Sequence, residues 1–536
     1  MKKFFTIIIA ISLTVNAFAL DVWDGTSAPW NNGSGTQNDP YLIETAANLA
    51  YLAEKVNEGY QAQGMEVFAH TYFLMTDDLD LNNINWTPIG NVNMNMQGFY
   101  FAGIFDGWYH NIDHLKIQSS ADVCGLFGGL GGEQAPPPGS RTGVIQHLSV
   151  TNGNITSTGT GVGGIVGGMA GEAFVYQCSF SGTISVSNSG SYCGAGGIAA
   201  AMAGNSSIDE CSFHGSITAT NNGGFTGAAG AGGIVGIAMD QASISQCYNT
   251  GNITGNAFMV SVAAGIIGAT LQENDVTVYS CYNVGTVNAS TKGGIFGMVS
   301  PINPFKEETE INVSNSYYLN TCGGTTSYGT SKTSAEMQTE QFKNQIDQNA
   351  HKFVMDNGTN NGYPIHALTG FILNDASDIT EHSATLSANI HCGNLAFSRV
   401  YFLYQDIDGN DYHEIDVATD GYVEAVIEDL EENTEYMFSM IAEYGDGSFV
   451  GFDWRYFTTE FDNVDEVANT TIQIYPNPTS EFIFIEGIEP QSVAIYSLDG
   501  RLIKTCENSN VIDVRDLDAG LYLVNIGNKQ WKLIKR

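Results

Sequence analysis

The chain has 536 residues, among them 62 glycines, and its 57 acidic and 19 basic residues give a formal net charge of -38. This charge excludes a basic nucleic-acid binder, because such proteins place Lys and Arg against phosphates, and it disfavours anionic membranes as partners. The acidity is uneven, since residues 371–470 hold 22 acids and two bases whereas residues 141–300 hold six acids and two bases. The length predicts three to four domains.

The first 19 residues have the three-part order of a secretory signal peptide. Two lysines precede an apolar run over residues 4–15, and residues 17–19 read Ala-Phe-Ala. We expect cleavage between Ala19 and Leu20. A membrane anchor needs about 20 apolar residues, and no segment of the sequence meets that length, so no transmembrane segment is predicted.

A short helix is expected near the start of the mature chain. Thr45 can cap a helix over residues 46–57, where Leu49, Leu52, Ala53 and Val56 fall at helical spacing. Such a helix would cover the open end of a β-structure. For the four tryptophans of this region, core or cap packing is favoured over exposed sugar-binding platforms: Trp23, Trp30, Trp86 and Trp108.

Internal repeats are the strongest signal in the sequence. A box of Gly, two apolar residues and Gly recurs every 29–39 residues, with a degenerate copy at residues 197–200. Short runs rich in Ile, Val, Phe and Ser lie between the boxes and favour a parallel β-solenoid; a propeller is the alternative, but its blades usually need 40 or more residues. The box glycines are Gly125 and Gly128, Gly164 and Gly167, Gly233 and Gly236, Gly265 and Gly268, and Gly294 and Gly297.

The cysteines divide into two groups. Cys178, Cys211, Cys247 and Cys281 recur at steps of 33, 36 and 34 residues, and we expect them to form a ladder of small buried thiols. The remaining five are scattered, and the sequence leaves a disulfide among them open: Cys124, Cys193, Cys322, Cys392 and Cys506.

The repeats resemble proteins that carry the GLUG motif, through the boxes and through residues 35–43, 78–90 and 101–107. The resemblance covers residues 20–368 and implies an all-β, right-handed parallel β-helix with caps. Family members include surface adhesins and accessory parts of bacterial peptidases. A second helical stretch, over residues 334–346, is expected to cap the other end.

The next module, residues 370–460, has alternating strands over residues 385–390, 399–404 and 435–442, separated by turn signals. It resembles fibronectin type III domains, which implies a β-sandwich, and residues 430–436 and 457–459 carry the likeness. Residues 461–470 form an acidic linker.

The last segment, residues 471–536, closely resembles the type A C-terminal sorting domain of type IX secretion cargo. The family implies a small antiparallel β-domain that engages the type IX machinery, export from the periplasm to the outer-membrane surface of a Bacteroidota-like bacterium, and anchoring to lipopolysaccharide or release. The residues that carry the likeness are Tyr475, Pro476, Asn477, Pro478, Gly500, Gly520, Tyr522 and Lys532.

No catalytic residue, metal site or cofactor is predicted. His110 and His114 would serve zinc only on a helix. The Asp78, Asp80, Asn82 and the Asp406, Asp408, Asn410 triplets start like calcium loops and leave calcium open as an alternative. Both lack the glycine and the distant glutamate of such a loop, and turn formation, which explains both, is favoured. Carboxylates are scarce in the repeats, and the adjacent pair Asp209 and Glu210 would point apart on a strand.

The sequence therefore predicts an adhesin-like surface protein, not an enzyme, whose solenoid meets an unknown glycan or protein ligand. The alternatives are a β-helical carbohydrate-active enzyme, an accessory part of a surface peptidase system, or a structural surface-layer component. A groove with two facing carboxylates, or a cleft lined by Lys and Arg, would favour an enzyme.

Overall fold

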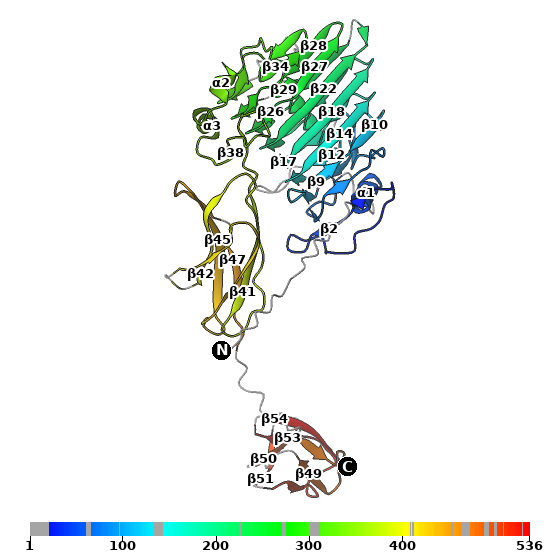
Figure 1. Cartoon of the computed structure of the whole chain (residues 1–536). Coiled ribbons are helices and arrows are strands. Elements are labelled where there is room, and N and C mark those ends of the chain that lie inside the picture. Colours follow the sequence, from blue (N-terminus) through cyan, green and yellow to red (C-terminus); the bar gives the residue numbers. More distant parts are fainter. Residues whose placement is uncertain are drawn as a thin grey trace, which may run out of the picture.

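A computed structural model describes residues 21–59, 66–95, 97–131, 143–224, 227–270, 275–299, 311–407, 409, 412–451, 454–461, 472–486, 492–497, 501–507, 509–527 and 529–536. The described residues form a β-solenoid, a β-sandwich and a small antiparallel β-domain (Figure 1). The predicted all-β fold is confirmed. The expected signal cleavage between Ala19 and Leu20 and nearly all of the acidic linker lie outside the described residues.

The solenoid is built from four sheets, to which successive turns of the chain add parallel strands. The largest has 13 strands among the described residues: β1 (Asp21–Val22), β5 (Leu79–Asp80), β9 (Asn111–Asp113), β10 (Lys116–Ser119), β14 (Ser149–Ser157), β18 (Ser179–Asn188), β22 (Ser212–Asn221), β26 (Tyr248–Asn249), β27 (Asn252–Ala257), β31 (Tyr282–Asn283), β32 (Val287–Asn288), β36 (Tyr317–Leu319) and β37 (Thr330–Lys332). Its long strands lie side by side as a broad sheet (Figure 1).

Three further sheets close the coil, all parallel apart from the pairing of β6 with β7. The first contains β2 (Tyr41–Ile43), β4 (Tyr72–Met75), β8 (Ile104–Asp106), β13 (Val144–Gln146), β17 (Phe174–Tyr176), β21 (Ser207–Asp209), β25 (Ser243–Ser245), β30 (Val276–Tyr279) and β35 (Ile311–Ser314). The second contains β3 (Glu66–Val67), β6 (Asn91–Val92), β7 (Gly98–Phe101), β12 (Phe127–Gly131), β16 (Val166–Ala170), β20 (Ala199–Met202), β24 (Val235–Ala238), β29 (Ile267–Thr270) and β34 (Phe296–Val299). The third contains β11 (Val123–Cys124), β15 (Gly161–Gly163), β19 (Tyr192–Gly196), β23 (Ala228–Gly232), β28 (Val260–Ala264) and β33 (Thr291–Gly293).

Each glycine box begins in the short connection between a strand of the six-stranded sheet and the next strand of the nine-stranded sheet that contains β12. Their first glycines are needed for close approach, because a Cβ on Gly233 would lie 2.0 Å from the Gly265 carbonyl oxygen and 2.6 Å from the Asn249 side chain. A Cβ on Gly164 would likewise lie 2.6 Å from the Phe180 ring. The box glycines do not adopt positive φ. Their role is therefore close contact between turns, and not the tight-turn conformation that glycine also permits.

The predicted cysteine ladder is confirmed. Cys178, Cys211, Cys247 and Cys281 are buried and free, and the Sγ atoms of the last three each lie 3.4 Å from the backbone nitrogen of the preceding ladder member. Burial raises the pKa of the Cys211, Cys247 and Cys281 thiols well above its ordinary value. The five other cysteines are also free, so the structure holds no disulfide among them; Cys392 and Cys506 are the two that are partly exposed.

Helices lie at the first and at the last turns of the solenoid (Figure 1). Only the first joins the solenoid core, because the second helical stretch packs on the Tyr248, Tyr282 and Tyr317 rings of the large sheet. Helix α1 (Ala46–Asn57) has the predicted Thr45 cap, and its apolar face joins the solenoid core. The second predicted helix is instead two short ones, α2 (Ser334–Met337) and α3 (Glu340–Asp347), because Thr339 starts a new helix by accepting a hydrogen bond from the Phe342 nitrogen at 3.2 Å. Burial of Trp23 and Trp86 confirms core packing for these two tryptophans, while Trp30 and Trp108 are half-buried.

Residues 348–368, called the strap from here on, follow α3 and contain the two-stranded sheet of β38 (Phe353–Val354) and β39 (Ile365–His366). A β-sandwich comes next, with three strands in one sheet and five in the other among the described residues. The strands are β40 (Gly370–Leu373), β41 (Ala384–His391) and β44 (Gly421–Ile427), packed on β42 (Phe397–Asp406), β43 (His413–Val417), β45 (Glu435–Tyr444), β46 (Phe449–Gly451) and β47 (Arg455–Thr458).

The sandwich has the strand pairing of a fibronectin-like module, and Tyr436 makes a tyrosine corner by accepting a hydrogen bond from the Glu431 nitrogen at 2.9 Å. The final domain packs two antiparallel sheets around its own core. Its strands are β48 (Gln473–Tyr475), β49 (Phe482–Glu486) and β52 (Val511–Asp513), then β50 (Ser492–Ser497), β51 (Leu502–Glu507), β53 (Gly520–Ile526) and β54 (Lys529–Lys535).

Candidate functional site

The outward side of the 13-stranded sheet carries uncharged polar side chains in register. Strands β14, β18, β22 and β27 are parallel and aligned, so residues at matching positions form ladders across the turns. Neighbouring strands lie about 4.8 Å apart. We call the half-buried and exposed members of three such ladders the open polar face: Asn154, Thr156, Thr183, Ser185, Ser187, Ser216, Thr218, Thr220, Asn252, Thr254 and Asn256.

One end of the open polar face leads to a shallow hollow of about 630 Å³. Thr220 and Asn256 from the face line it, together with the aromatic ring of Phe258. Phe258 is 69% exposed and Met259 is 54% exposed. An exposed ring beside amides and hydroxyls provides both stacking and hydrogen bonding to a ligand.

The other end of the sheet begins with residues in a left-handed backbone conformation. Successive turns place a non-glycine residue with φ between 44° and 52° at the corner that precedes the large sheet, an uncommon conformation for such side chains. Gln177 and Glu210 are neighbours in this corner ladder, and the Gln177 amide donates to Glu210 at 2.8 Å. The corner residues are His147, Gln177, Glu210, Gln246, Ser280 and Asn315.

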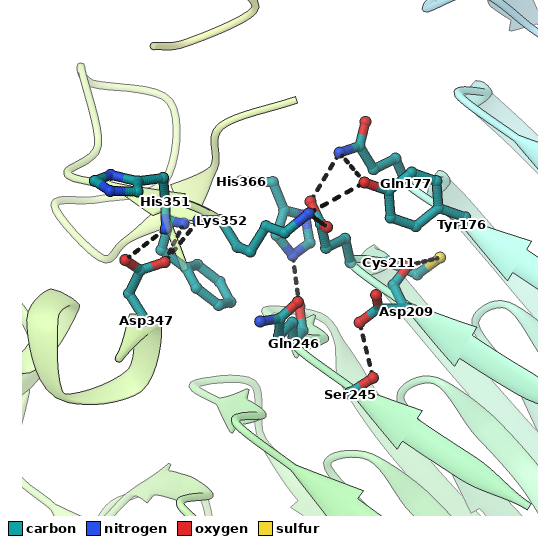
Figure 2. A network of polar contacts seen from close by, with 12 residues as sticks. Tyr176, Gln177, Asp209, Cys211, Ser245, Gln246, Asp347, His351, Lys352 and His366 are labelled. Atoms are coloured by element: carbon teal, nitrogen blue, oxygen red, sulfur yellow. Dashed lines mark hydrogen bonds and ion pairs between the residues drawn. The ribbon is translucent and has the colours of Figure 1, made fainter. Parts of the chain in front are cut away.

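The strap is fixed to this corner by a buried ion pair (Figure 2). Lys352 forms an ion pair with Glu210, whose side chain is fully buried, and its ammonium group also donates to the Tyr176 hydroxyl at 3.2 Å. Burial is the largest single effect and would lower the pKa of Lys352, but attraction by Glu210 and Tyr176 and the hydrogen bonds to both together outweigh it, and the pKa lies above its ordinary value.

Two further contacts hold the strap in place. The carboxylate of Asp347 accepts hydrogen bonds from the backbone nitrogens of His351, Lys352 and Phe353 at 2.7–3.0 Å. The His366 ring contacts the Gln246 carbonyl oxygen at 2.8 Å (Figure 2).

A cleft of about 430 Å³ lies between the start of the large sheet and the strap. Its floor continues the polar ladders: Ser149, Ser179 and Ser212 are aligned on β14, β18 and β22, with Tyr248 next in line on β26. A second row contributes Ser181 beside His214. Strap and sandwich residues form the opposite side: Thr359, Asn360, Ile365, His366, Leu368 and Asn394.

Aromatic rings stand at both ends of the cleft. At one end Tyr109 stacks on His147, with ring centroids 4.6 Å apart, and on His391 of the sandwich at 3.8 Å. At the other end Tyr248 contacts the His366 ring at 4.6 Å. The His351 ring of the strap also stacks on Tyr444 of the sandwich at 3.9 Å, so reciprocal histidine–tyrosine contacts join the solenoid to the sandwich.

The lining of the cleft has no carboxylate, ammonium or guanidinium group among the described residues. Burial lowers the pKa of His214 to about 4. Burial also lowers the pKa of His366 to about 3, although its contact with the Gln246 carbonyl opposes the shift. Both rings are therefore neutral at pH 7, and the two nitrogens of His214 face the hydroxyls of Thr250 and Ser212 at 2.8 and 3.3 Å.

The carboxylates and histidines considered from the sequence are engaged elsewhere. Asp209 accepts a hydrogen bond from Ser245 at 2.8 Å, and burial raises its pKa, whereas Glu210 binds Lys352. His110 and His114 lie beside different aspartates, Asp78 at 3.2 Å and Asp80 at 3.0 Å.

Only the first of the two calcium-like triplets lies entirely within the described residues. Asp80 accepts a hydrogen bond from the backbone nitrogen of Asn82 at 2.7 Å, which is the turn that the sequence predicts. Asp408 and Asn410 lie outside the described residues. Among the residues with described positions, no group of three or more His, Cys, Asp or Glu is arranged to hold a metal ion.

The sorting-domain residues lie near the last strand. The Asn477 amide donates to the Lys532 carbonyl at 2.6 Å and accepts from the Ile534 nitrogen at 2.9 Å, which holds the Tyr475–Pro478 segment against β54. Tyr522 donates to the Asp518 carbonyl at 3.0 Å. Lys532 and Gly520 are exposed, and Gly500 lies outside the described residues.

Sequence reasoning missed the cleft, the corner ladder and the strap. The residue before each ladder cysteine is polar, as in Gln177, Glu210, Gln246 and Ser280, and this regularity was the available signal. No pattern in the sequence predicted the pairing of Glu210 with Lys352, because several repeats separate the two residues along the chain.

Comparison with known families identifies two parts of the chain. Residues 227–254 match the GLUG motif, and residues 473–536 match the secretion system C-terminal sorting domain. The chain therefore carries a GLUG motif and a type IX sorting domain. This domain implies interaction with the type IX machinery and places the protein at the cell surface or outside the cell. No helix in the described parts of the chain has the length and apolarity to span a membrane.

Individual proteins match only parts of the chain. A protein described as a Gly-rich membrane protein of Evansella cellulosilytica is 30% identical over 172 residues, which are 32% of this chain and 18% of that protein. Among solved structures, a two-domain fibronectin type III segment of chicken tenascin is 19% identical and covers 31% of this chain and 97% of its own, with a TM-score of 0.16. The sensor domain of the anti-sigma factor RsgI4 of Pseudobacteroides cellulosolvens is 21% identical, covers 17% of this chain and 95% of its own, and has a TM-score of 0.15.

Proposed function

We propose that this protein is an adhesin-like surface protein whose solenoid binds neutral polymers, and that it has no catalytic activity of its own. A signal peptide ending at Ala19 would deliver it to the periplasm. The sorting domain would then carry it to the surface, where it is anchored to lipopolysaccharide or released.

The observation that carries the proposal is the open polar face. Its hydroxyl and amide groups repeat across β14, β18, β22 and β27 without a charged member, and Lys116 of β10 extends one ladder at its edge. The groups therefore match a ligand that also repeats and is also uncharged. Each contact is weak, and several in a row add through avidity. Phe258 at the edge of the face adds an exposed ring for stacking.

An enzymatic role finds less support in the site. Glu210 is fully buried and forms an ion pair with Lys352, whereas Asp209 accepts a hydrogen bond from Ser245. The two carboxylates therefore do not face a common cleft. Glycoside hydrolysis needs two carboxyl groups on opposite sides of a bond. Calcium is not required by the proposal.

The test is a glycan and host-protein array probed with the mature chain, residues 20–536. We expect binding to at least one neutral polysaccharide and loss of that binding in Thr218→Lys, which places a long charged side chain in the middle of the face. Thr458→Lys, an exposed change on β47 of the sandwich, is the matched control and should bind normally. Binding to nothing on the array, together with hydrolysis of a polysaccharide panel, would contradict the proposal.

A further inference from the structure

The cleft under the strap differs from the open polar face in shape. The face is open along its ladders, whereas the cleft is bounded by a floor, by the strap and by rings at both ends. Its volume of about 430 Å³ lies within the range of small-molecule sites, about 300–1,000 Å³. A ligand in the cleft would therefore be surrounded, while a ligand on the face would lie along it.

The chemistry of the lining selects an uncharged ligand with many hydroxyl groups. No carboxylate, ammonium or guanidinium group lines the cleft among the described residues, and His214 and His366 are neutral at pH 7. The third lining histidine, His147, is engaged by Asp106 at 2.9 Å. An anionic or cationic ligand would lose its hydration without gaining a counter-charge. A neutral saccharide meets instead a row of serine hydroxyls and two aromatic ends, and each provides a contact that sugars use.

The donors and acceptors of the floor are oriented in advance. His214 fixes the hydroxyls of Ser212 and Thr250, and Ser179 donates to Ser149 at 3.0 Å. The hydroxyl of Ser181 lies in the second row, beside His214, and no described residue makes a hydrogen bond to it. Fixed polar groups in a partly enclosed space cost less entropy on binding than mobile ones do.

We infer that this cleft is a binding site for the end of a neutral saccharide chain, one to three sugar units long. The inference rests on the proposed function for the nature of the ligand but concerns a separate site. The floor of the cleft and the open polar face share the strands β14, β18 and β22, so one polymer could lie along the face and place its terminal units in the cleft.

Two substitutions test the inference. Ser181→Phe places a ring inside the cleft. Thr458→Phe adds the same ring at an exposed position on β47 of the sandwich, outside both the cleft and the open polar face. Far-UV circular dichroism and the thermal unfolding midpoint show whether both variants fold like the wild type.

The probes are neutral trisaccharides of glucose, mannose, galactose, xylose and N-acetylglucosamine, with trigalacturonic acid as the charged comparison, measured against the mature chain by titration calorimetry and saturation-transfer NMR. We expect at least one neutral trisaccharide to bind, trigalacturonic acid not to bind, Ser181→Phe to weaken binding at least about tenfold, and Thr458→Phe to leave it unchanged. Absence of neutral trisaccharide binding, or equal effects of the two variants, would overturn the inference.

The outcome separates this site from the proposed function. Loss of polymer binding in Thr218→Lys without trisaccharide binding by the wild type would leave the open polar face in place and remove the cleft. Trisaccharide binding that only Ser181→Phe weakens, without polymer binding on the array, would support the cleft alone.

Discussion

The ion pair between Lys352 and Glu210 gives the sharpest prediction about how the cleft is held together. Lys352→Met keeps the length of the side chain but leaves the Glu210 carboxylate buried without its cation. The Glu210 side chain is 0% exposed and that of Lys352 is 33% exposed. Removing one partner of a buried pair costs about 3–5 kcal/mol.

We take the lower end of that range, about 3 kcal/mol, because water reaches Lys352 and Gln177 still donates to Glu210. At 1.36 kcal/mol per tenfold change, this corresponds to an increase of about 150-fold in the population with the strap open. The effect should be local, since Lys352 joins the strap to the solenoid and the solenoid core lies elsewhere.

Hydrogen–deuterium exchange of the full chain measures this opening at individual amides. The amides of residues 352, 353 and 367, which bind Asp347 or the Lys352 carbonyl, should exchange about 150-fold faster in Lys352→Met. The control is Lys343→Met on α3, whose ion pair with the largely exposed Glu340 spans 3.5 Å and contributes at most about 1 kcal/mol.

A double variant tests the cause of the effect. Glu210→Gln with Lys352→Met removes both charges, so no carboxylate is left unpaired, and strap exchange should return to within about tenfold of the wild type. Unchanged strap exchange in Lys352→Met, or a double variant as open as the single one, would refute the assignment of the strap to this ion pair.

Three further predictions concern the fold. Gly233→Ala should lower the free energy of solenoid unfolding by about 3 kcal/mol, because its Cβ would lie 2.0 Å from a carbonyl oxygen, and urea unfolding should separate it from the exposed Gly190→Ala control. The two partly exposed cysteines should react with iodoacetamide in the native protein and the seven buried ones only in denaturant, as mass spectrometry can verify; early labelling of a ladder cysteine would argue against a closed core. The pKa values of His214 and His366, about 4 and about 3, lie below the ordinary 6.5, so the unfolded chain binds more protons and stability falls as the pH drops from 6.5 towards 4. At pH 5 the loss is about 2 kcal/mol for each histidine, and a strap equally protected at pH 7 and pH 5 would contradict it.

The repetitive part of the fold was predictable because the same residue types recur at a nearly constant spacing in the sequence. Glycines such as Gly233 and the ladder cysteines recur once per turn, and each turn repeats the contacts of its neighbour. The break between α2 and α3 was missed because the apolar spacing of Met337, Phe342 and Ile346 continues across it. The cap at Thr339 decides the local structure there, and its effect depends on where Phe342 packs.

The candidate site was not predictable in the same way. The cleft forms where residues 359–368 pack over strands that precede them by many residues in the sequence. The periodic pattern of the repeats does not indicate this contact. Glu210 looked like half of an adjacent carboxylate pair, yet its left-handed backbone directs it into the corner ladder and towards Lys352. Only the neutrality of the repeats was visible beforehand, and it is the property on which the proposed ligand class depends.

The most direct test of the central claim measures retention of the mature chain on immobilised cellulose, xylan, mannan, chitin and starch in 50 and 500 mM NaCl. An uncharged face binding an uncharged polymer should be insensitive to salt, whereas attraction through the acidic sandwich would be screened. We predict that at least one polysaccharide retains the wild type and Thr458→Lys equally in both salts and does not retain Thr218→Lys. Failure of all five to retain the wild type, retention that disappears at high salt, or retention that Thr218→Lys does not alter would contradict it.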